Sequence, residues 1–173
     1  MPRAPRSTKD HREKGPKTVT TAVITMSDTR THETDESGLI IKELLEGYGH
    51  KVIRHVVCRD EPSLLNEELD RILSVGVDAV LINGGTGLAP RDISIETVSL
   101  RLEKKMDGFG ELFRLLSYEE IGSAAMLSRA LAGTSQGVLI FCLPGSPDAV
   151  RLGMDKLILP ELSHIIGLVK KQG

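Results

Sequence analysis

The chain has 173 residues, of which 40% are hydrophobic and 27% are charged, and its formal net charge at pH 7 is −2. This length suits one domain with a sizeable core, and so small a net charge leaves no electrostatic footprint for nucleic acid or acidic lipid. With no Trp, three Phe and two Tyr, the core must be aliphatic, and stacking platforms for single-stranded nucleic acid are not expected.

The charge is uneven along the chain. Residues 1–17 hold six Lys/Arg and two Asp/Glu, a net charge of +4, so the remainder carries −6. The segment has no apolar periodicity, so we predict a disordered basic tail at 1–17 and one folded domain at 18–173. Such a tail can bind nucleic acid, but it is more often a solvated extension.

Membrane and secretory signals are not seen in the sequence. No apolar run reaches the ~18 residues of a membrane span, and the start has no secretory pattern. Cys58 and Cys142 both lie in apolar runs and are typical of core thiols rather than a disulfide. We therefore expect a cytoplasmic protein.

The first half of the chain alternates between two patterns. Apolar, β-branched runs predict buried strands, and apolar residues at helical spacing predict helices. The strands are predicted at 19–28, 51–58 and 78–82, and the helices at 37–50 and 60–76.

The second half is less regular. We predict a short helix at 94–103, short helices at 108–122 where glycines interrupt the pattern, a strand at 138–143, and a final helix interrupted at Pro160. The stretch 128–132 could be an antiparallel partner of that strand or the end of a helix. Strands that alternate with helices predict an α/β sandwich with a mostly parallel sheet and helices on both faces.

Small, flexible and acidic residues follow the predicted strands. In open α/β sheets the ligand site lies at the carboxyl ends of the strands. A fold that needed only turns would not require two glycine loops and three aspartates on one edge. The residues at this edge are Ser27, Asp28, Arg59, Asp60, Gly84, Gly85, Thr86, Gly87, Arg91, Asp92, Pro144, Gly145, Ser146 and Pro147.

The stretch 83–94, "NGGTGLAPRDIS", is compatible with phosphate binding. It is not a Walker A loop, because no Lys-Ser/Thr pair follows at the right spacing, and it lacks the G-x-G-x-x-G of a dinucleotide site. Its glycines let backbone N–H groups approach an oxyanion closely, and Thr86 adds a hydroxyl. Asp92 could hold Mg²⁺, which takes one or two carboxylates together with phosphate oxygens and water.

Each of these residues also has a purely structural interpretation. Asp60 and Asp92 both precede a predicted helix and could cap it, Asp28 could form an Asx turn, and Ser146 could cap the last helix. The glycine loop could be only a turn, and Arg91 a surface charge. The five histidines show no metal-ligand spacing. The aspartates, Ser146, Arg91 and the glycine loop all lie on one rim of the predicted sheet, and together they favour a binding site.

Four motifs resemble the MogA/MoaB family of molybdenum cofactor biosynthesis, and its MoaB branch in particular. The resemblance runs from about residue 18 to the end of the chain and implies a three-layer α/β/α sandwich. It also implies a mixed, mostly parallel sheet with one antiparallel strand, which it assigns to "SRALAG" at 128–133. The motifs are "VITMSD" (23–28), "NGGTGLAPRDISIE" (83–96), "MLSRALAG" (126–133) and "CLPGSPDAV" (142–150).

The resemblance implies a function. Family members with known activity bind molybdopterin, transfer AMP from ATP to its terminal phosphate with Mg²⁺, and hand the product on for metal insertion. On this basis Asp60 and Asp92 are predicted to be catalytic and to hold Mg²⁺. The predicted substrate-binding residues are Ser27, Asp28, Gly84, Gly85, Thr86, Gly87, Arg91, Ser128, Arg129, Pro144, Gly145 and Ser146.

The resemblance also implies assembly into trimers, or hexamers made of two trimers, and a downstream metal-insertion protein as partner. Residues 108–122 hold three of the five aromatic residues, and aromatic residues are enriched in interface cores, although such a segment could equally belong to the core. Two other functions stay open, a molybdopterin carrier without catalysis and a trimeric scaffold. Neither would need Asp60 and Asp92 on the binding rim.

Overall fold

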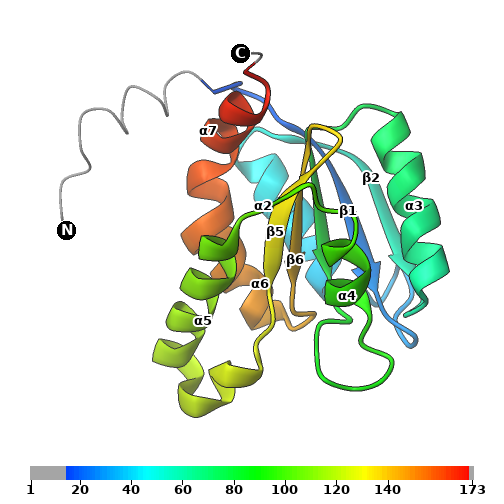
Figure 1. The fold of residues 1–173 in the computed structure, drawn as a ribbon, viewed down its shortest axis with the longest axis vertical. Helices are drawn as coiled ribbons and strands as arrows, with labels where there is room; N and C mark the ends of the chain where they lie inside the picture. Colours follow the sequence, from blue (N-terminus) through cyan, green and yellow to red (C-terminus); the bar gives the residue numbers. More distant parts are fainter. Residues whose placement is uncertain (1–14, 172–173) are drawn as a thin grey trace.

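A six-stranded mixed sheet lies between two layers of helices (Figure 1). The fold is seen in a computed structural model that describes residues 15–171. The predicted basic tail at 1–17 lies outside the described residues except for its last three positions. No helix among residues 15–171 has the length and apolar character needed to cross a membrane.

The sheet has the strand order β2-β1-β3-β6-β5-β4. Strands β1, β2, β3 and β6 are parallel, β5 runs antiparallel to β6, and β4 pairs antiparallel with β5. The sheet is thus mostly parallel with β5 alone reversed, which confirms the predicted architecture. The bounds are β1 Thr20–Met26, β2 Lys51–Cys58, β3 Ala79–Asn83, β4 Lys104–Lys105, β5 Leu131–Ser135 and β6 Val138–Leu143.

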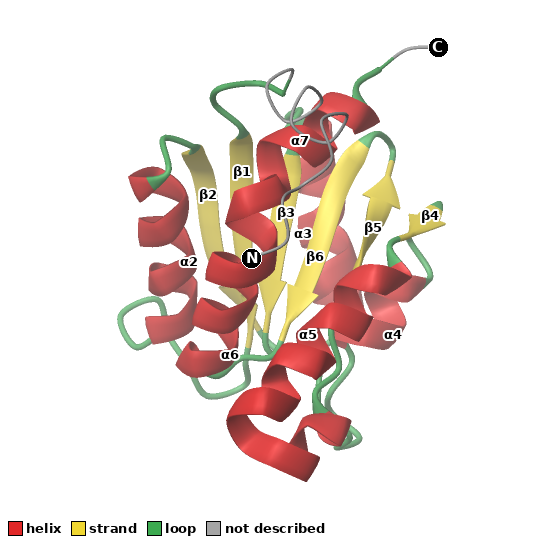
Figure 2. Cartoon of the chain, turned by 90° about the vertical axis from the view of Figure 1, so that its left-hand side faces the viewer, coloured by secondary structure: helices red, strands yellow, loops and turns green. Residues whose placement is uncertain are grey.

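Helices cover both faces of the sheet, as predicted (Figure 2). Helices α2, α5, α6 and α7 pack on one face, and α3 and α4 on the other. A 3₁₀ segment, η1, follows α5, and a π-helical turn, η2, joins α6 to α7. The bounds are α2 Glu36–Gly47, α3 Pro62–Ser74, α4 Ser94–Ser99, α5 Asp107–Ile121, η1 Gly122–Leu127, α6 Pro147–Gly153, η2 Met154–Ile158 and α7 Leu159–Val169.

The two helical layers create two cores, one on each face of the sheet. Val23 of β1 and its partner Leu81 of β3 point into one core, while the next pair, Ile24 and Ile82, points into the other. All four side chains are fully buried. A strand covered on both faces has no polar side, which is why these strands stand out in the sequence as continuous apolar runs.

Residues 107–121 form one helix, whereas the sequence predicted several short ones. Gly108 lies in open space, but a Cβ at Gly110 would come within 2.8 Å of the Ala130 carbonyl oxygen. A helical Gly costs about 1 kcal/mol relative to Ala. Here that cost is offset, because Gly110 lets α5 pack closely against Ala130, the residue just before β5.

Three other predicted boundaries shift. The helix predicted at 94–103 ends at Ser99, and the two-residue strand β4 that follows was not predicted. The antiparallel strand starts at Leu131, so Ser128 and Arg129 precede it. The final helix was predicted to be interrupted at Pro160, but its irregular part is the π-helical turn just before that residue. Pro160 itself lies in the first turn of α7.

The aromatic residues of α5 are divided between core and surface. Phe109 and Phe113 are buried. The ring centroids of Phe109 and Phe141 lie 5.1 Å apart, and the two rings meet edge to face. Tyr118 is 61% exposed. The prediction that these aromatics together form an interface is therefore wrong for the two phenylalanines, because the helix turns them toward the sheet.

Replacing Phe113 with Ala should lower the free energy of unfolding by about 3–5 kcal/mol, because it leaves a cavity in a fully buried site. Urea unfolding followed by circular dichroism measures this. Glu111→Ala, on the exposed face of the same helix, serves as the control and should change stability by less than about 1 kcal/mol. Equal effects of the two substitutions would place Phe113 outside the core.

Candidate active site

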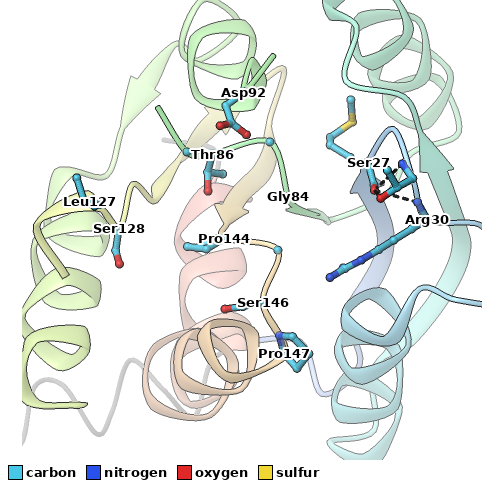
Figure 3. A pocket seen from close by; sticks show the side chains of 15 residues that line it. Ser27, Arg30, Gly84, Thr86, Asp92, Leu127, Ser128, Pro144, Ser146 and Pro147 are labelled. Carbon is cyan, nitrogen blue, oxygen red and sulfur yellow. Dashed lines mark hydrogen bonds between the residues drawn. The ribbon is translucent and has the colours of Figure 1, made fainter. Parts of the chain in front are cut away.

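A cleft of about 580 Å³ opens at the carboxyl ends of β1, β3 and β6 (Figure 3). Three loops form most of its wall, one after each of these strands, and the end of η1 closes one side. The structure brings most of the predicted binding residues together there. Those that line the cleft are Ser27, Gly84, Gly85, Thr86, Gly87, Asp92, Ser128, Pro144, Gly145 and Ser146.

The floor of the cleft is backbone packed against backbone. Gly84 has a φ of 87°, and a Cβ there would lie 2.2 Å from the carbonyl oxygen of Met26. A Cβ on Gly145 would lie 3.0 Å from the Gly84 Cα, and the Gly84 N–H donates to the Leu143 carbonyl at 3.0 Å. A side chain at Gly84 would therefore push the three loops apart.

The glycine loop is anchored through its carbonyl groups. Ser94 Oγ donates to the Gly84 carbonyl at 2.8 Å, and the Ser94 N–H donates to the Gly85 carbonyl at 2.9 Å. The N–H groups of Gly85, Thr86 and Gly87 donate no hydrogen bond to any residue in the described range. They are available to an anionic ligand, as phosphate-binding loops require.

Arg129 braces this loop from outside the cleft lining. Its Nε donates to the Thr86 carbonyl at 2.8 Å and its Nη2 to the Gly87 carbonyl at 2.6 Å. Glu96 of α4 pairs with the same guanidinium. Arg129 was predicted to bind substrate; its side chain lies against the loop carbonyls and does not line the cleft.

Asp60 carries a buried carboxylate oxygen without a partner. Its Oδ1 has no hydrogen bond to any described residue, and a Cβ on Gly85 would lie 2.8 Å from it. Burial, and then the negative charges of Asp28 and Asp92, raise the pKa of Asp60. Asp60 does not cap α3, whose N-cap is Glu61 with no side-chain hydrogen bond.

Asp92 lies on the opposite end of the glycine loop. Its Oδ2 accepts a hydrogen bond from the Ala89 N–H at 2.9 Å and would touch a Cβ on Gly87 at 2.5 Å. The N-cap of α4 is Ile93, with no side-chain hydrogen bond. The capping interpretation therefore fails for Asp92 too, whereas Ser146 does cap α6, accepting from the Ala149 N–H.

Asp28 and Arg91 form an exposed pair beside Asp60. Arg91 Nη2 donates to Asp28 Oδ1 at 2.8 Å, and the Asp60 N–H donates to the same oxygen at 3.2 Å. The hydrogen bond from Arg91 lowers the pKa of Asp28. Neither side chain lines the cleft, so the pair ties the loop after β1 to the loop after β3.

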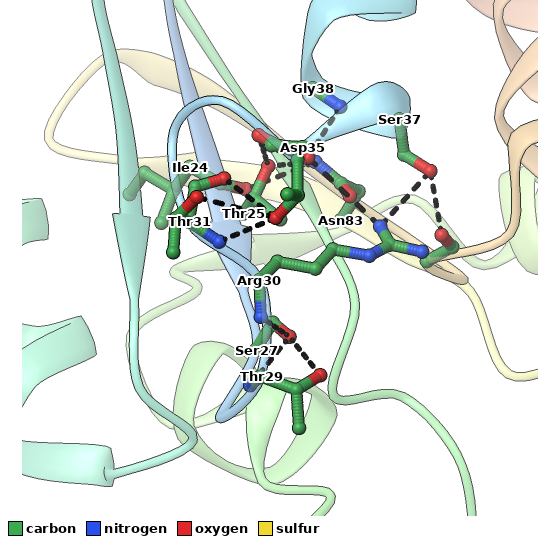
Figure 4. Close-up of polar contacts among 12 residues, drawn as sticks. Ile24, Thr25, Ser27, Thr29, Arg30, Thr31, Asp35, Ser37, Gly38 and Asn83 are labelled. Carbon is green, nitrogen blue, oxygen red and sulfur yellow. Dashed lines mark hydrogen bonds and ion pairs between the residues drawn. The ribbon is translucent and has the colours of Figure 1, made fainter.

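A buried polar cluster behind the cleft was not predicted (Figure 4). Asp35, fully buried at the N-cap of α2, accepts hydrogen bonds from Thr25 Oγ1 at 2.6 Å and the Gly38 N–H at 2.9 Å. His55 Nε2 lies 2.7 Å from Asp35 Oδ2. Burial alone would raise the pKa of Asp35, but the hydrogen bonds from His55, Thr25 and Gly38 outweigh it and lower that pKa.

Two residues that line the cleft beside this cluster were also absent from the predicted set. They are Thr29 and Arg30, in the loop after β1.

The position of Asp35 before "ESGLI" is typical of a helix N-cap and could have been predicted from the sequence. Its pairing with His55 could not, because the two residues come from different elements.

A sequence profile described as a probable molybdopterin binding domain matches residues 22–164. Molybdenum cofactor biosynthesis protein B of Halalkalibacterium halodurans is 48% identical over 167 residues, which is 95% of this chain and 98% of that protein. A crystal structure of molybdenum cofactor biosynthesis protein B is 50% identical with a TM-score of 0.87, over 91% of this chain and 99% of the other. The crystal structure of tungsten cofactor synthesizing protein MoaB from Pyrococcus furiosus is 36% identical with a TM-score of 0.82, over 90% and 99%.

Asp35→Asn should lower the free energy of unfolding at pH 7 by about 1.5–3 kcal/mol, because it weakens charge-assisted hydrogen bonds in a buried cluster. The pKa of Asp35 is lowered from its ordinary value of 3.8. Its stabilising effect is therefore complete above about pH 5 and is lost as the pH falls through the folded-state pKa.

Urea unfolding at a series of pH values between about 7 and 2 tests this. The difference between wild type and Asp35→Asn should shrink toward the acid end of the series. Asp155→Asn, at an exposed position, is the control. A difference for Asp35→Asn that stays constant at all pH values would contradict the assignment of a charged Asp35.

Proposed function

The chain belongs to the molybdopterin-binding MogA/MoaB family and acts in molybdenum cofactor biosynthesis, and from this premise we propose that it transfers AMP from ATP to the terminal phosphate of molybdopterin. Mg²⁺ would be the cofactor, ATP and molybdopterin the substrates, and a metal-insertion protein the recipient of the product. The observation that carries the proposal is the buried Asp60 Oδ1 without a hydrogen-bond partner.

The acidic residues fit Mg²⁺ bound together with phosphate. No group of three or more His, Cys, Asp or Glu side chains that could hold a metal occurs among the described residues, so the protein does not supply a full coordination shell. Mg²⁺ usually takes only one or two carboxylates and completes its shell with phosphate oxygens and water. Asp60 and Asp92, on either side of the glycine loop, would hold it. When bound, it would neutralise charge on the reacting phosphate.

The chain's own groups would orient the two phosphates. The free N–H groups of Gly85, Thr86 and Gly87 would hold phosphate oxygens, and Arg129 would keep the loop in that conformation. An oxygen of the molybdopterin phosphate would attack the α-phosphorus of ATP, forming one P–O bond as the bond to pyrophosphate breaks. No protein nucleophile is needed, so catalysis rests on positioning and charge stabilisation.

The two alternatives explain less. A molybdopterin carrier without catalysis would use the glycine loops but gains nothing from a buried carboxylate oxygen without a partner, which costs stability. A pure scaffold would not need the cleft. The reaction also fits a cytoplasmic setting, where ATP is supplied and the free thiols of Cys58 and Cys142 stay reduced.

Asp60→Asn and Asp92→Asn should each lower the rate of AMP transfer by about 100-fold or more, because each removes charge that would hold the cofactor. Asp60→Asn should leave the stability at pH 7 unchanged or higher, since the pKa of Asp60 is raised in the fold and the charged form is therefore disfavoured there. Formation of adenylylated molybdopterin from MgATP, and thermal unfolding, measure the two effects.

Asp155→Asn is the matched control for this experiment and should retain the wild-type rate. A fully active Asp60→Asn or Asp92→Asn variant at saturating Mg²⁺ would rule out the proposed role of that carboxylate.

We also propose that the protein assembles into trimers or pairs of trimers. The outer face of α5 and the η1 segment expose a set of apolar side chains with a hollow of about 390 Å³ among them. Exposed apolar patches of this kind mark interaction sites, and closed symmetry would bury them. The most exposed members are Leu115, Tyr118, Ile121, Met126 and Leu127, each at least 55% exposed.

Light scattering at micromolar concentration should give three or six times the 18.8 kDa mass of the chain. Leu115→Glu should lower that mass, because it puts a charge into the patch, while Glu46→Gln, at an exposed position of α2 outside the patch, should not. A wild-type monomer would refute the proposal, and an intact Leu115→Glu oligomer would move the interface elsewhere.

A further inference from the structure

Arg30 is the single positively charged side chain among the described residues that line the cleft. It follows β1 and was not among the predicted binding residues. Its guanidinium group extends across the cleft toward the loop that carries Pro144, Ser146 and Pro147 (Figure 3). The side chain is 30% exposed, so it is partly shielded yet open to a ligand.

The position of Arg30 is fixed from two sides. Ser27 Oγ accepts a hydrogen bond from the Arg30 N–H at 3.0 Å and so holds its backbone in a turn. At the other end, Arg30 Nη1 donates to Ser37 Oγ at 3.2 Å, and Ser37 Oγ donates to the Gly145 carbonyl at 2.7 Å (Figure 4). Arg30 is thereby linked to the loop after β6.

The guanidinium group keeps most of its donors free. Asp35 Oδ1 lies 4.0 Å from Nη1, which gives attraction without a hydrogen bond. An arginine has five N–H donors in a planar fork, and to the described residues this one donates only the bond to Ser37. The remaining donors match a phosphate group, which a guanidinium binds in a bidentate way.

The charges of the cleft distinguish the two phosphates that the proposed reaction brings together. Asp92 in the lining, and Asp60 beside Gly85 outside the lining, repel a phosphate that arrives without a metal ion, so that side suits the nucleotide with Mg²⁺. Arg30 lies on the side of Gly145 and Ser146, where the lining holds no carboxylate. A phosphate monoester, which carries about −1.5 to −2 at neutral pH, is matched there by the fixed cation.

We propose that Arg30 binds the terminal phosphate monoester of molybdopterin, the acceptor of the AMP group. This assignment rests on the proposed function, because it takes molybdopterin and ATP as the two substrates. By neutralising the acceptor phosphate, Arg30 would also reduce its repulsion from the α-phosphate of ATP. The nucleotide phosphates are the other source of the same chemistry, and the test separates the two.

The test measures binding without turnover. Equilibrium ultrafiltration under anaerobic conditions gives the dissociation constants of molybdopterin, of molybdopterin whose phosphate has been removed enzymatically, and of MgATP. Arg30→Gln should weaken molybdopterin binding by about 10- to 100-fold, the usual effect of losing a charge-assisted hydrogen bond. It should change the affinities for dephosphorylated molybdopterin and for MgATP by less than about threefold.

Two further variants complete the design. Arg30→Lys keeps the charge but loses the fork, so it should weaken molybdopterin binding by an intermediate factor. Arg151→Gln, on an exposed position of α6, makes the same change in net charge and should bind all three ligands like wild type. Because Arg30→Gln must still bind dephosphorylated molybdopterin and MgATP, those two affinities also show that it is folded.

Three results would overturn the assignment. These are unchanged molybdopterin binding by Arg30→Gln, an equal loss for the dephosphorylated pterin, or a loss of MgATP affinity comparable with the loss for molybdopterin. A wild-type protein that binds molybdopterin but transfers no AMP would refute the proposed function instead, and the role of Arg30 would still be decided by the binding data.

Discussion

The contact of three backbone segments at Gly84 is the constraint on which the rest of the site depends. Because β1, β3 and β6 are parallel neighbours, their carboxyl ends meet, and Gly84 lies against Met26 on one side and Gly145 on the other. With no side chain between them, the three loops form one continuous rim. The glycine loop can then turn its carbonyls toward Ser94 and Arg129, while the N–H groups of Gly85, Thr86 and Gly87 have no partner among the described residues.

Two carboxylates near this rim, the fully buried Asp35 and the half-buried Asp60, show how the fold separates structure from function. Asp35 is fully satisfied by hydrogen bonds, and its pKa is lowered, so its charge stabilises the loop that carries Arg30. Asp60 has an oxygen without a partner and a raised pKa, so its charge opposes folding. A bound cation would compensate the charge of Asp60, and this contrast between the two residues supports the proposed role of Asp60 in the reaction.

Much of the fold could be predicted because its strands are buried on both faces and its turns carry glycine. The predicted strand at 51–58 coincides with β2, and the glycine loop lies where the sequence placed it. Properties that depend on distant partners could not be predicted. The pairing of Asp35 with His55, the inward turn of Phe113 and the direction of the Arg129 side chain all follow from packing between elements, which local patterns do not encode.

ATP that is radioactive at its α-phosphate shows directly whether the cleft joins AMP to molybdopterin, because the label follows the AMP group. Wild-type protein, anaerobic molybdopterin, MgCl₂ and pyrophosphatase are incubated together, and the products are separated by chromatography. We expect the label to move to a pterin product with two inorganic phosphates formed for each AMP transferred, because pyrophosphatase splits the released pyrophosphate, and we expect omission of either Mg²⁺ or molybdopterin to abolish this transfer. Label that remains in ATP, in the presence of molybdopterin that the protein has bound, would contradict the proposed function.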